Sequence, residues 1–315
     1  MDGGDRREVL LRFRRFAMAC SFELILTGAD RDYLEQVAGV VLDEVESLDR
    51  KLSCFSPTSE VSYLNSEAGR RPIIVSPDLF EILRLARRVW KETEGAFDVT
   101  AGPLIALWRE AERIGVEPTK DVLDKVLHQI GMQHVLIDEI SNSVRFDIDG
   151  IGINLGAIGK GYAVKRAAEI LREYNIKSAL ISAGGSTIYG LADECGQAGW
   201  RVGVRHPSKF EERIAEVTLR SRAISTSGGP MQRDPAVKER FEHIIDPRTG
   251  LPANGGLVSA SVVAEDAALS DALATAFYML GMRFAESYCR VHEGVEAILV
   301  EAVSGSEAFS VRRIP

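Results

Sequence analysis

The sequence predicts an α+β protein with a mixed, largely antiparallel sheet and packed helices. Short β-like runs and amphipathic helices follow one another irregularly, without the strand–helix–strand order of a doubly wound parallel sheet. The chain has 315 residues, of which 45% are hydrophobic and 27% charged, so it can bury a large core. No linker rich in Pro, Ser or Gly, no charge block and no repeat divides it. We therefore expect one continuous unit over residues 1–315.

The N-terminal third is predicted to contain one strand and two helices. Residues 22–26 alternate in hydropathy as a strand does, and apolar residues recur at helical spacing through residues 34–52. Ser76 as an N-cap, followed by Pro77 in the first turn, predicts a second helix that ends before Gly95. We expect the apolar faces of both helices to be buried.

The remainder of the chain is predicted to consist mostly of strands. One helix follows a glycine-rich turn near Lys160, and another spans residues 271–280. The β-like runs occupy residues 134–138, 144–148, 178–182, 200–204, 217–219 and 258–264, and a last strand pair closes the chain. Since regular βαβ alternation is missing, the pattern favours antiparallel over parallel pairing.

Charge and hydropathy argue against two classes of partner. The chain has 38 basic and 46 acidic side chains, a net charge of −8, and no basic run that could follow a phosphate backbone, so we expect no nucleic-acid partner. It has no window of about 18 apolar residues and no signal or lipid-attachment pattern, so we expect no membrane span and a cytoplasmic location. Its four cysteines are widely spaced and lack the CxxC pairs of a zinc site, so we expect them to be reduced.

A glycine-rich segment, residues 154–162 (NLGAIGKGY), leads from a β-like run into a helix. The first N–H groups of that helix and the charge of Lys160 would stabilise an anion such as a pyrophosphate. The spacing matches neither a Walker A loop nor a dinucleotide-binding turn, and a tight strand-to-helix turn without a ligand explains it equally well. Two other glycine runs, residues 182–186 and 226–229, end β-like stretches and are either close-contact sites or hairpin turns.

Asp271 and Thr275 are four residues apart, so on a helix their oxygens lie on one face. A carboxylate and a hydroxyl suit a hard cation such as Mg²⁺, which keeps its other positions for water and substrate phosphates. The alternative is structural, with Ser270 as the N-cap and Asp271 as a favourable charge at the helix N-terminus. The residues alone leave both interpretations open.

Three further loops contain candidate binding residues. His243 precedes an Asp-Pro…Gly turn and is either a general base, a hydrogen-bond partner of the substrate, or a structural histidine. Residues 53–56, with Phe55, and residues 94–100, with Phe97, place an aromatic side chain among small polar groups after a helix. Such loops suit a planar ligand.

Together and in this order, these segments resemble the ApbE-type FAD:protein FMN transferase family. The matching segments are residues 48–65 (LDRKLSCFSPTSEVSYLN), 94–108 (EGAFDVTAGPLIALW), 154–163 (NLGAIGKGYA), 179–185 (ALISAGG), 223–228 (AISTSG), 243–252 (HIIDPRTGLP) and 270–281 (SDALATAFYMLG). Each segment alone is a weak signal, but seven in order along nearly the whole chain are specific. The resemblance implies an ApbE-like, T-fold-like architecture.

The resemblance also implies an enzyme and its ligands. Family members transfer the FMN half of FAD through a phosphoester to a Thr or Ser hydroxyl of an acceptor protein and release AMP. The implied Mg²⁺ ligands are the backbone carbonyl of Ala157 and the side chains of Asp271 and Thr275. The implied FAD contacts are Met18 in the first strand, Phe55, Ala96, Phe97, Asp98, Asn154, Lys160, His243 and Ile244. Because phosphoryl transfer asks for positioning and charge neutralisation, we expect Lys160 to act as a cation and Asp98 or His243 as the base.

Some positions depart from the usual family pattern, and alternative functions stay open. Asn154 and Lys165 stand where the family usually has acidic residues, and Gly229-Pro230 where it usually has a tyrosine. One alternative is an Mg²⁺-dependent FAD pyrophosphatase that yields FMN and AMP. Another is a non-catalytic flavin carrier or accessory protein, but a carrier has no need of a metal across the pyrophosphate.

Overall fold

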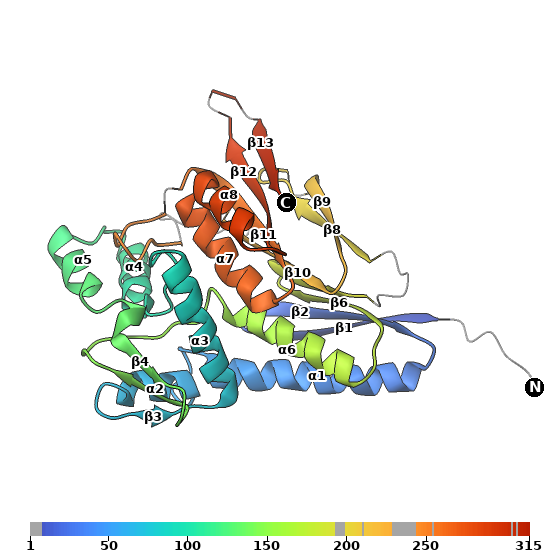
Figure 1. Cartoon of the computed structure of the whole chain (residues 1–315), viewed down its shortest axis with the longest axis horizontal. Helices are drawn as coiled ribbons and strands as arrows, with labels where there is room; N and C mark the ends of the chain where they lie inside the picture. Colours follow the sequence, from blue (N-terminus) through green and yellow to red (C-terminus); the bar gives the residue numbers. More distant parts are fainter. Residues whose placement is uncertain are drawn as a thin grey trace, which may run out of the picture.

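An eight-stranded antiparallel sheet forms the centre of the fold (Figure 1). The computed structural model describes residues 8–192, 199–209, 211–228, 244–253, 255–303, 305–306 and 308–315. Within these residues the strand order is β1-β2-β6-β7-β10-β11-β12-β13, and every neighbouring pair is antiparallel. The strands are β1 (Val9–Ala17), β2 (Cys20–Gly28), β6 (Ser178–Ala183), β7 (Thr187–Leu191), β10 (Arg222–Gly228), β11 (Leu257–Ala264), β12 (Glu296–Ala302) and β13 (Phe309–Ile314). The predicted α+β class is confirmed.

Helices α1 (Arg31–Leu52), α6 (Gly159–Glu173) and α7 (Ala267–Leu280) cover one face of this sheet. α1 contacts β1 and β2, α6 contacts β6 and β7, and α7 packs on β10 and β11 (Figure 1). The buried side chains of α1 recur every three or four residues from Leu34 to Leu52, as the sequence predicts. One apolar core therefore joins these helices to the sheet.

A hairpin of β8 (Trp200–Arg205) and β9 (Arg213–Leu219) packs on the opposite face of the sheet. Side chains alternate between the two faces of a strand. Ala223 of β10 accordingly belongs to the core under the helices, whereas Ile224 belongs to a second core under the hairpin. Ser225, two residues after Ala223, faces α7.

The remaining elements form a smaller part beside the large sheet (Figure 1). A three-stranded sheet has the order β3-β5-β4. The elements are α2 (Glu60–Glu67), β3 (Ile73–Ile74), α3 (Pro77–Glu92), α4 (Gly102–Ile114), α5 (Lys120–Leu127), the 3-10 helix η1 (Met132–His134), β4 (Val135–Asp138) and β5 (Ser143–Phe146). α8 (Met282–Val291) instead packs beside α7, against β12 and β13 of the large sheet (Figure 1). Trp108 of α4 and Leu123 of α5 share a separate apolar cluster with Ile245. This cluster lies under one wall of the site described below.

The N-terminal elements confirm one prediction and correct two. Ser76 caps α3 by accepting a hydrogen bond from the Leu79 N–H, as predicted. The first strand is β1, and the predicted residues 22–26 lie in β2. β1 escaped notice because its hydropathy alternation is blurred by Leu10 and Phe16, which point to solvent. Met18 is not in a strand: it lies in the turn between β1 and β2, at a φ of 50°.

The glycine runs take two different conformations. Gly184 and Gly185 have φ angles of 59° and 72° and form the tight turn between β6 and β7, as a hairpin requires. Thr226, Ser227 and Gly228 belong to β10 itself and are not a loop, and Gly229 lies outside the described residues. Among the described residues, every helix is too short or too polar to cross a membrane.

Candidate functional site

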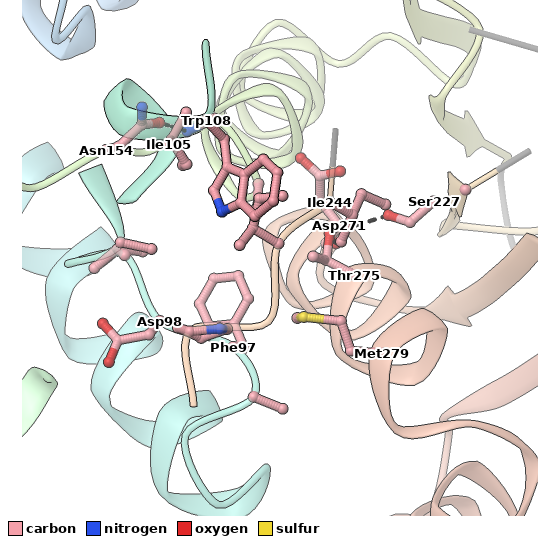
Figure 2. Close-up of a pocket in the computed structure, with 18 of the residues that line it drawn as sticks. Phe97, Asp98, Ile105, Trp108, Asn154, Ser227, Ile244, Asp271, Thr275 and Met279 are labelled. Carbon is pink, nitrogen blue, oxygen red and sulfur yellow. Dashed lines mark hydrogen bonds between the residues drawn. The ribbon is translucent and has the colours of Figure 1, made fainter. Parts of the chain in front are cut away.

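A pocket of about 410 Å³ lies where α4, α6, α7 and the end of β10 meet (Figure 2). Its lining comes from segments that are far apart in the sequence. The lining residues include Ala96, Phe97, Asp98, Ile105, Trp108, Arg109, Asn154, Ala157, Lys160, Ser227, Ile244, Asp271, Thr275 and Met279. The fold therefore brings the Phe97 loop, the glycine-rich segment and the Asp271–Thr275 pair to one place.

The segment that precedes α6 carries Asn154 to the pocket. Asn65 of α2 holds this segment, because its Nδ2 donates to the Ile153 carbonyl at 3.0 Å and its Oδ1 accepts from the Ile153 N–H at 2.8 Å. The Asn154 N–H donates to the Val99 carbonyl at 2.7 Å. The Asn154 Oδ1 accepts from the Gly156 N–H at 2.9 Å. Contacts to α2, to the Phe97 loop and to the next turn thus fix the place of Asn154.

The glycine-rich segment forms the first turn of α6, which begins at Gly159. The Gly161 N–H donates to Oδ2 of Asp271 at 2.9 Å, so this group, predicted to be open to an anion, already has a partner. Gly161 also lets α6 approach α7 closely, because a Cβ there would lie 2.4 Å from the Ala267 carbonyl oxygen. Lys160 lines the pocket and supplies a cation to its wall.

The alternative interpretation of Asp271, in which Ser270 is the N-cap of this helix, is wrong. Asp266, not Ser270, is the N-cap, and its carboxylate accepts from the Ala268 and Leu269 N–H groups. Ser270 is fully buried and donates its hydroxyl to the Val262 carbonyl at 2.7 Å. Asp271 lies beyond the first turn of α7 and does not cap that helix.

Asp271 and Thr275 lie on one face of α7 and both line the pocket, as their spacing predicts (Figure 2). Only 5% of Asp271 is exposed. Its Oδ1 accepts from the Thr187 hydroxyl at 3.2 Å, opposite the bond from Gly161 to Oδ2. The Thr275 Oγ1 is 3.0 Å from the Ser227 Oγ of β10. A buried carboxylate and a hydroxyl therefore face the pocket together.

The oxygen donors at this wall fit a hard cation. Both hydrogen bonds to Asp271 come from neutral donors, so they leave its buried negative charge without neutralisation. The Gly161 N–H, which stands four residues after Ala157, bonds to Asp271 instead of completing a helical bond to the Ala157 carbonyl. One carboxylate, one hydroxyl and one carbonyl match the sparse oxygen set that Mg²⁺ takes from proteins. Among the described residues, no group of three or more His, Cys, Asp or Glu side chains could hold a metal ion.

Asp98 is engaged with its own loop. Its Oδ1 accepts from the Thr100 N–H at 2.7 Å and from the Thr100 hydroxyl at 2.6 Å, and its Oδ2 accepts from the Met132 N–H at 3.2 Å. Burial raises the pKa of the Asp98 carboxyl, although these hydrogen bonds act in the opposite direction. Figure 2 shows the carboxylate directed away from the Thr275 side of the pocket. This geometry suits a carboxylate that holds the Phe97 loop in place.

An apolar wall faces the polar one. Phe97, which is 2% exposed, and Trp108 stand opposite Thr275 and Met279 (Figure 2). The Trp108 indole donates to the Gly250 carbonyl at 2.7 Å, which fixes the plane of the ring. An apolar wall with aromatic rings suits a planar ring system. Trp108 is a lining residue that the sequence analysis missed, although it ends the segment 94–108.

Phe55 lies outside this pocket, in an adjoining one of about 580 Å³. Its ring is 68% exposed and lies under the Arg109 guanidinium, 4.7 Å from the ring centroid. The two pockets share Ile105, Arg109 and Asn154. Arg109 and Met279 also escaped the sequence analysis, because only their neighbours in space connect them to the site.

The predicted contact Met18 and the departure Lys165 lie outside the pocket lining. Met18, in the β1–β2 turn, does not line this pocket. His243 and Gly229-Pro230 lie outside the described residues. Lys165 forms ion pairs with Glu81 and with Asp266, the N-cap of α7.

The chain is similar to known proteins over most of its length. The ApbE family matches residues 18–299. A Vibrio cholerae protein named FAD:protein FMN transferase is 31% identical over 257 residues, which are 80% of this chain and 75% of that protein. A Klebsiella pneumoniae protein of the same name is 29% identical over 267 residues, 84% and 82% of the two chains. The crystal structure of the ApbE protein from Thermotoga maritima matches with a TM-score of 0.85 and 26% identity over 97% of each chain.

The family match covers most of the sequence, and relatives agree with this chain in sequence and in fold. The chain belongs to the ApbE family.

Proposed function

We propose that this protein is an Mg²⁺-dependent FAD:protein FMN transferase. It transfers the FMN moiety of FAD to a Thr or Ser hydroxyl of an acceptor protein and releases AMP. The observation that carries the proposal is the pairing of Asp271 and Thr275, on one face of α7, with Lys160 and an aromatic wall in a single pocket. The curated relatives that bear this name support it.

The proposed cation ligands are the Asp271 carboxylate, the Thr275 hydroxyl and the Ala157 carbonyl. A divalent cation bound there would neutralise negative charge on the pyrophosphate and on the transferring phosphoryl group. Lys160 lines the same pocket and adds a fixed positive charge beside the phosphates.

The rest of the lining orients the ligand. Phe97 and Trp108 give the isoalloxazine or adenine ring an apolar surface, and Asn154 offers an amide that both donates and accepts hydrogen bonds. The adjoining pocket, with Phe55 and Arg109, extends the space available to FAD.

The attacking hydroxyl needs a base, and the proposed base is His243. Asp98 is less suited to this role, because both of its carboxylate oxygens already accept hydrogen bonds from Thr100 and Met132. We assign Asp98 to holding the Phe97 loop. We also propose that residues 1–315 work as one unit, since a single apolar core includes Ala17 near one end and Ile314 near the other.

The test incubates the protein with FAD, Mg²⁺ and a flavinylation-domain acceptor that carries an accessible Thr or Ser. We expect flavin fluorescence that survives denaturing electrophoresis, disappears when the acceptor hydroxyl is replaced by Ala, and is lost with EDTA. Asp271→Asn should fold and lose about tenfold to a hundredfold or more in rate at limiting Mg²⁺. FMN and AMP without protein-bound flavin, across several acceptors, would instead identify a pyrophosphatase. FAD binding without turnover would identify a carrier.

A further inference from the structure

A chain of two buried hydroxyls ends on the Asp271 carboxylate. The Ser225 Oγ of β10 donates to the Thr187 Oγ1 of β7 at 3.2 Å, and the Thr187 Oγ1 donates to Oδ1 of Asp271 at 3.2 Å. Ser225 and Thr187 are both 0% exposed. Burying a hydroxyl costs free energy unless it is hydrogen-bonded. The Ser225 hydroxyl meets that requirement by its bond to Thr187, and the Thr187 hydroxyl by its bond to Asp271.

The sheet register brings the two hydroxyls together. Ser225 and Thr187 are directly opposite each other in the antiparallel pair of β10 and β7. Both side chains point to the face covered by α7, where the neighbouring position on β10 is the core residue Ala223. The two hydroxyls therefore lie among core residues under α7, where Thr187 reaches the Asp271 carboxylate.

The direction of the chain follows from chemistry. An ionised carboxylate only accepts hydrogen bonds, so the single hydroxyl proton of Thr187 goes to Asp271. Thr187 is then left with acceptor lone pairs, and Ser225 donates to it. The Gly161 N–H holds the other carboxylate oxygen at 2.9 Å. Each oxygen thus keeps a lone pair for a further partner.

We propose that Thr187, supported by Ser225, is a positioning residue that orients Asp271 as a cation ligand. This inference rests on the metal-dependent function proposed above. Thr187 and the Gly161 N–H hold the two carboxylate oxygens from different sides, so the side chain cannot rotate away from the pocket. Ser225 acts only through Thr187, because its contact is with the Thr187 hydroxyl.

The test measures the dissociation constant for Mn²⁺, by the spin-resonance signal of the free ion, and for Mg²⁺ by competition. Thr187→Val removes the donor at nearly constant shape and should weaken Mn²⁺ binding about tenfold to a hundredfold, the usual effect of losing a group that orients a metal ligand. Thr187→Ser should bind as the parent does. Ser225→Ala should weaken binding about threefold, as expected for one neutral hydrogen bond. The double variant should match Thr187→Val, because Ser225 has no other route to the metal.

Ser259→Ala is the matched control. Ser259 of β11 is 1% exposed and its hydroxyl has no hydrogen-bond partner among the described residues, so its removal deletes a buried hydroxyl of the same sheet without breaking a bond that the structure describes. Parental Mn²⁺ affinity is expected. An equal loss in Ser259→Ala and Thr187→Val would overturn the proposal, since it would mean a general packing effect.

The remaining outcomes separate the two proposals. If the parent binds Mn²⁺, Asp271→Asn does not, and Thr187→Val binds as the parent does, the role of Thr187 is refuted while the metal site stands. Failure of Thr187→Ser to restore affinity also refutes it. A parent without Mn²⁺ affinity refutes the metal site itself, and the role of Thr187 with it. If Thr187→Val does not fold, Ser225→Ala provides the test. An unchanged dissociation constant for Mn²⁺ in that variant would then refute the role of the two hydroxyls.

Discussion

The backbone N–H of Gly161 donates a 2.9 Å hydrogen bond to Oδ2 of Asp271, across 110 residues of sequence. This bond joins the first turn of α6 to the second turn of α7 and holds one oxygen of the carboxylate that faces the pocket. It requires a close approach of the two helices, because a Cβ at position 161 would lie 2.7 Å from the Asp271 Cβ.

Gly161→Ala should therefore destabilise the protein and disturb the site. Overpacking of a close contact typically costs about 1–3 kcal/mol of unfolding free energy, which urea unfolding will measure. Gly159→Ala is the matched control in the same helical turn, since its added Cβ would meet only the Leu155 Cβ at 3.8 Å. It should leave stability unchanged or raise it by up to about 1 kcal/mol, because Ala favours a helix over Gly. Equal stability of the two variants would contradict the close contact.

Asn65→Ala should lower both stability and FAD affinity. Ile153 is 1% exposed, and the substitution leaves its N–H and carbonyl without the two bonds that Asn65 supplies. An unsatisfied buried polar group costs about 1–3 kcal/mol, measurable by urea unfolding. The control is Ser66→Ala, one residue later, whose exposed hydroxyl donates only to the nearby Tyr63 carbonyl. If Asn65→Ala keeps parental stability and FAD binding, the segment that carries Asn154 is held by its other contacts.

Asp98 predicts a pH dependence of stability. Burial raises its pKa in the folded state above the ordinary value of 3.8, so the folded protein binds this proton more tightly than the unfolded chain does. Its contribution to stability is therefore fully present below pH 3.8 and is lost as the pH rises through the raised pKa. Urea unfolding of the parent and of Asp98→Asn between pH 4 and pH 7 will compare them. The parent should lose stability relative to the variant as the pH rises, and a gain would refute this assignment.

Phe55→Ala tests the adjoining pocket. If the Phe55 ring lies against a ring of FAD, its stacking contributes about 0.5–1.5 kcal/mol, and its loss should raise the dissociation constant for FAD by about threefold to tenfold. Fluorescence titration of FAD measures this constant. Phe16→Ala removes an equally exposed ring on β1 and should have no effect. An unchanged constant in both variants would mean that Phe55 supports Arg109 only.

The sequence by itself determined the helices that are marked by short-range patterns, such as apolar spacing or an N-cap. The spacing from Leu34 to Leu52 predicted α1, and Ser76 with Pro77 predicted the start of α3. The four-residue spacing of Asp271 and Thr275 predicted a shared helical face, because the geometry of an α-helix depends only on residues a turn apart. The ordered motifs predicted the family for the same reason, since each motif is a short local pattern.

Tertiary structure alone decided what those residues contact. Asn65 meets Ile153, Gly161 meets Asp271, and Thr187 of β7 meets the same carboxylate. These partners are chosen by strand register and helix packing, which depend on every element of the core and leave no periodic mark in the sequence. The sequence by itself therefore named the candidate ligands, Asp271 and Thr275. Packing decided which N–H and which hydroxyl hold Asp271, because hydrogen bonds between distant segments form only where the fold brings donors and acceptors within 3 Å or so of one another.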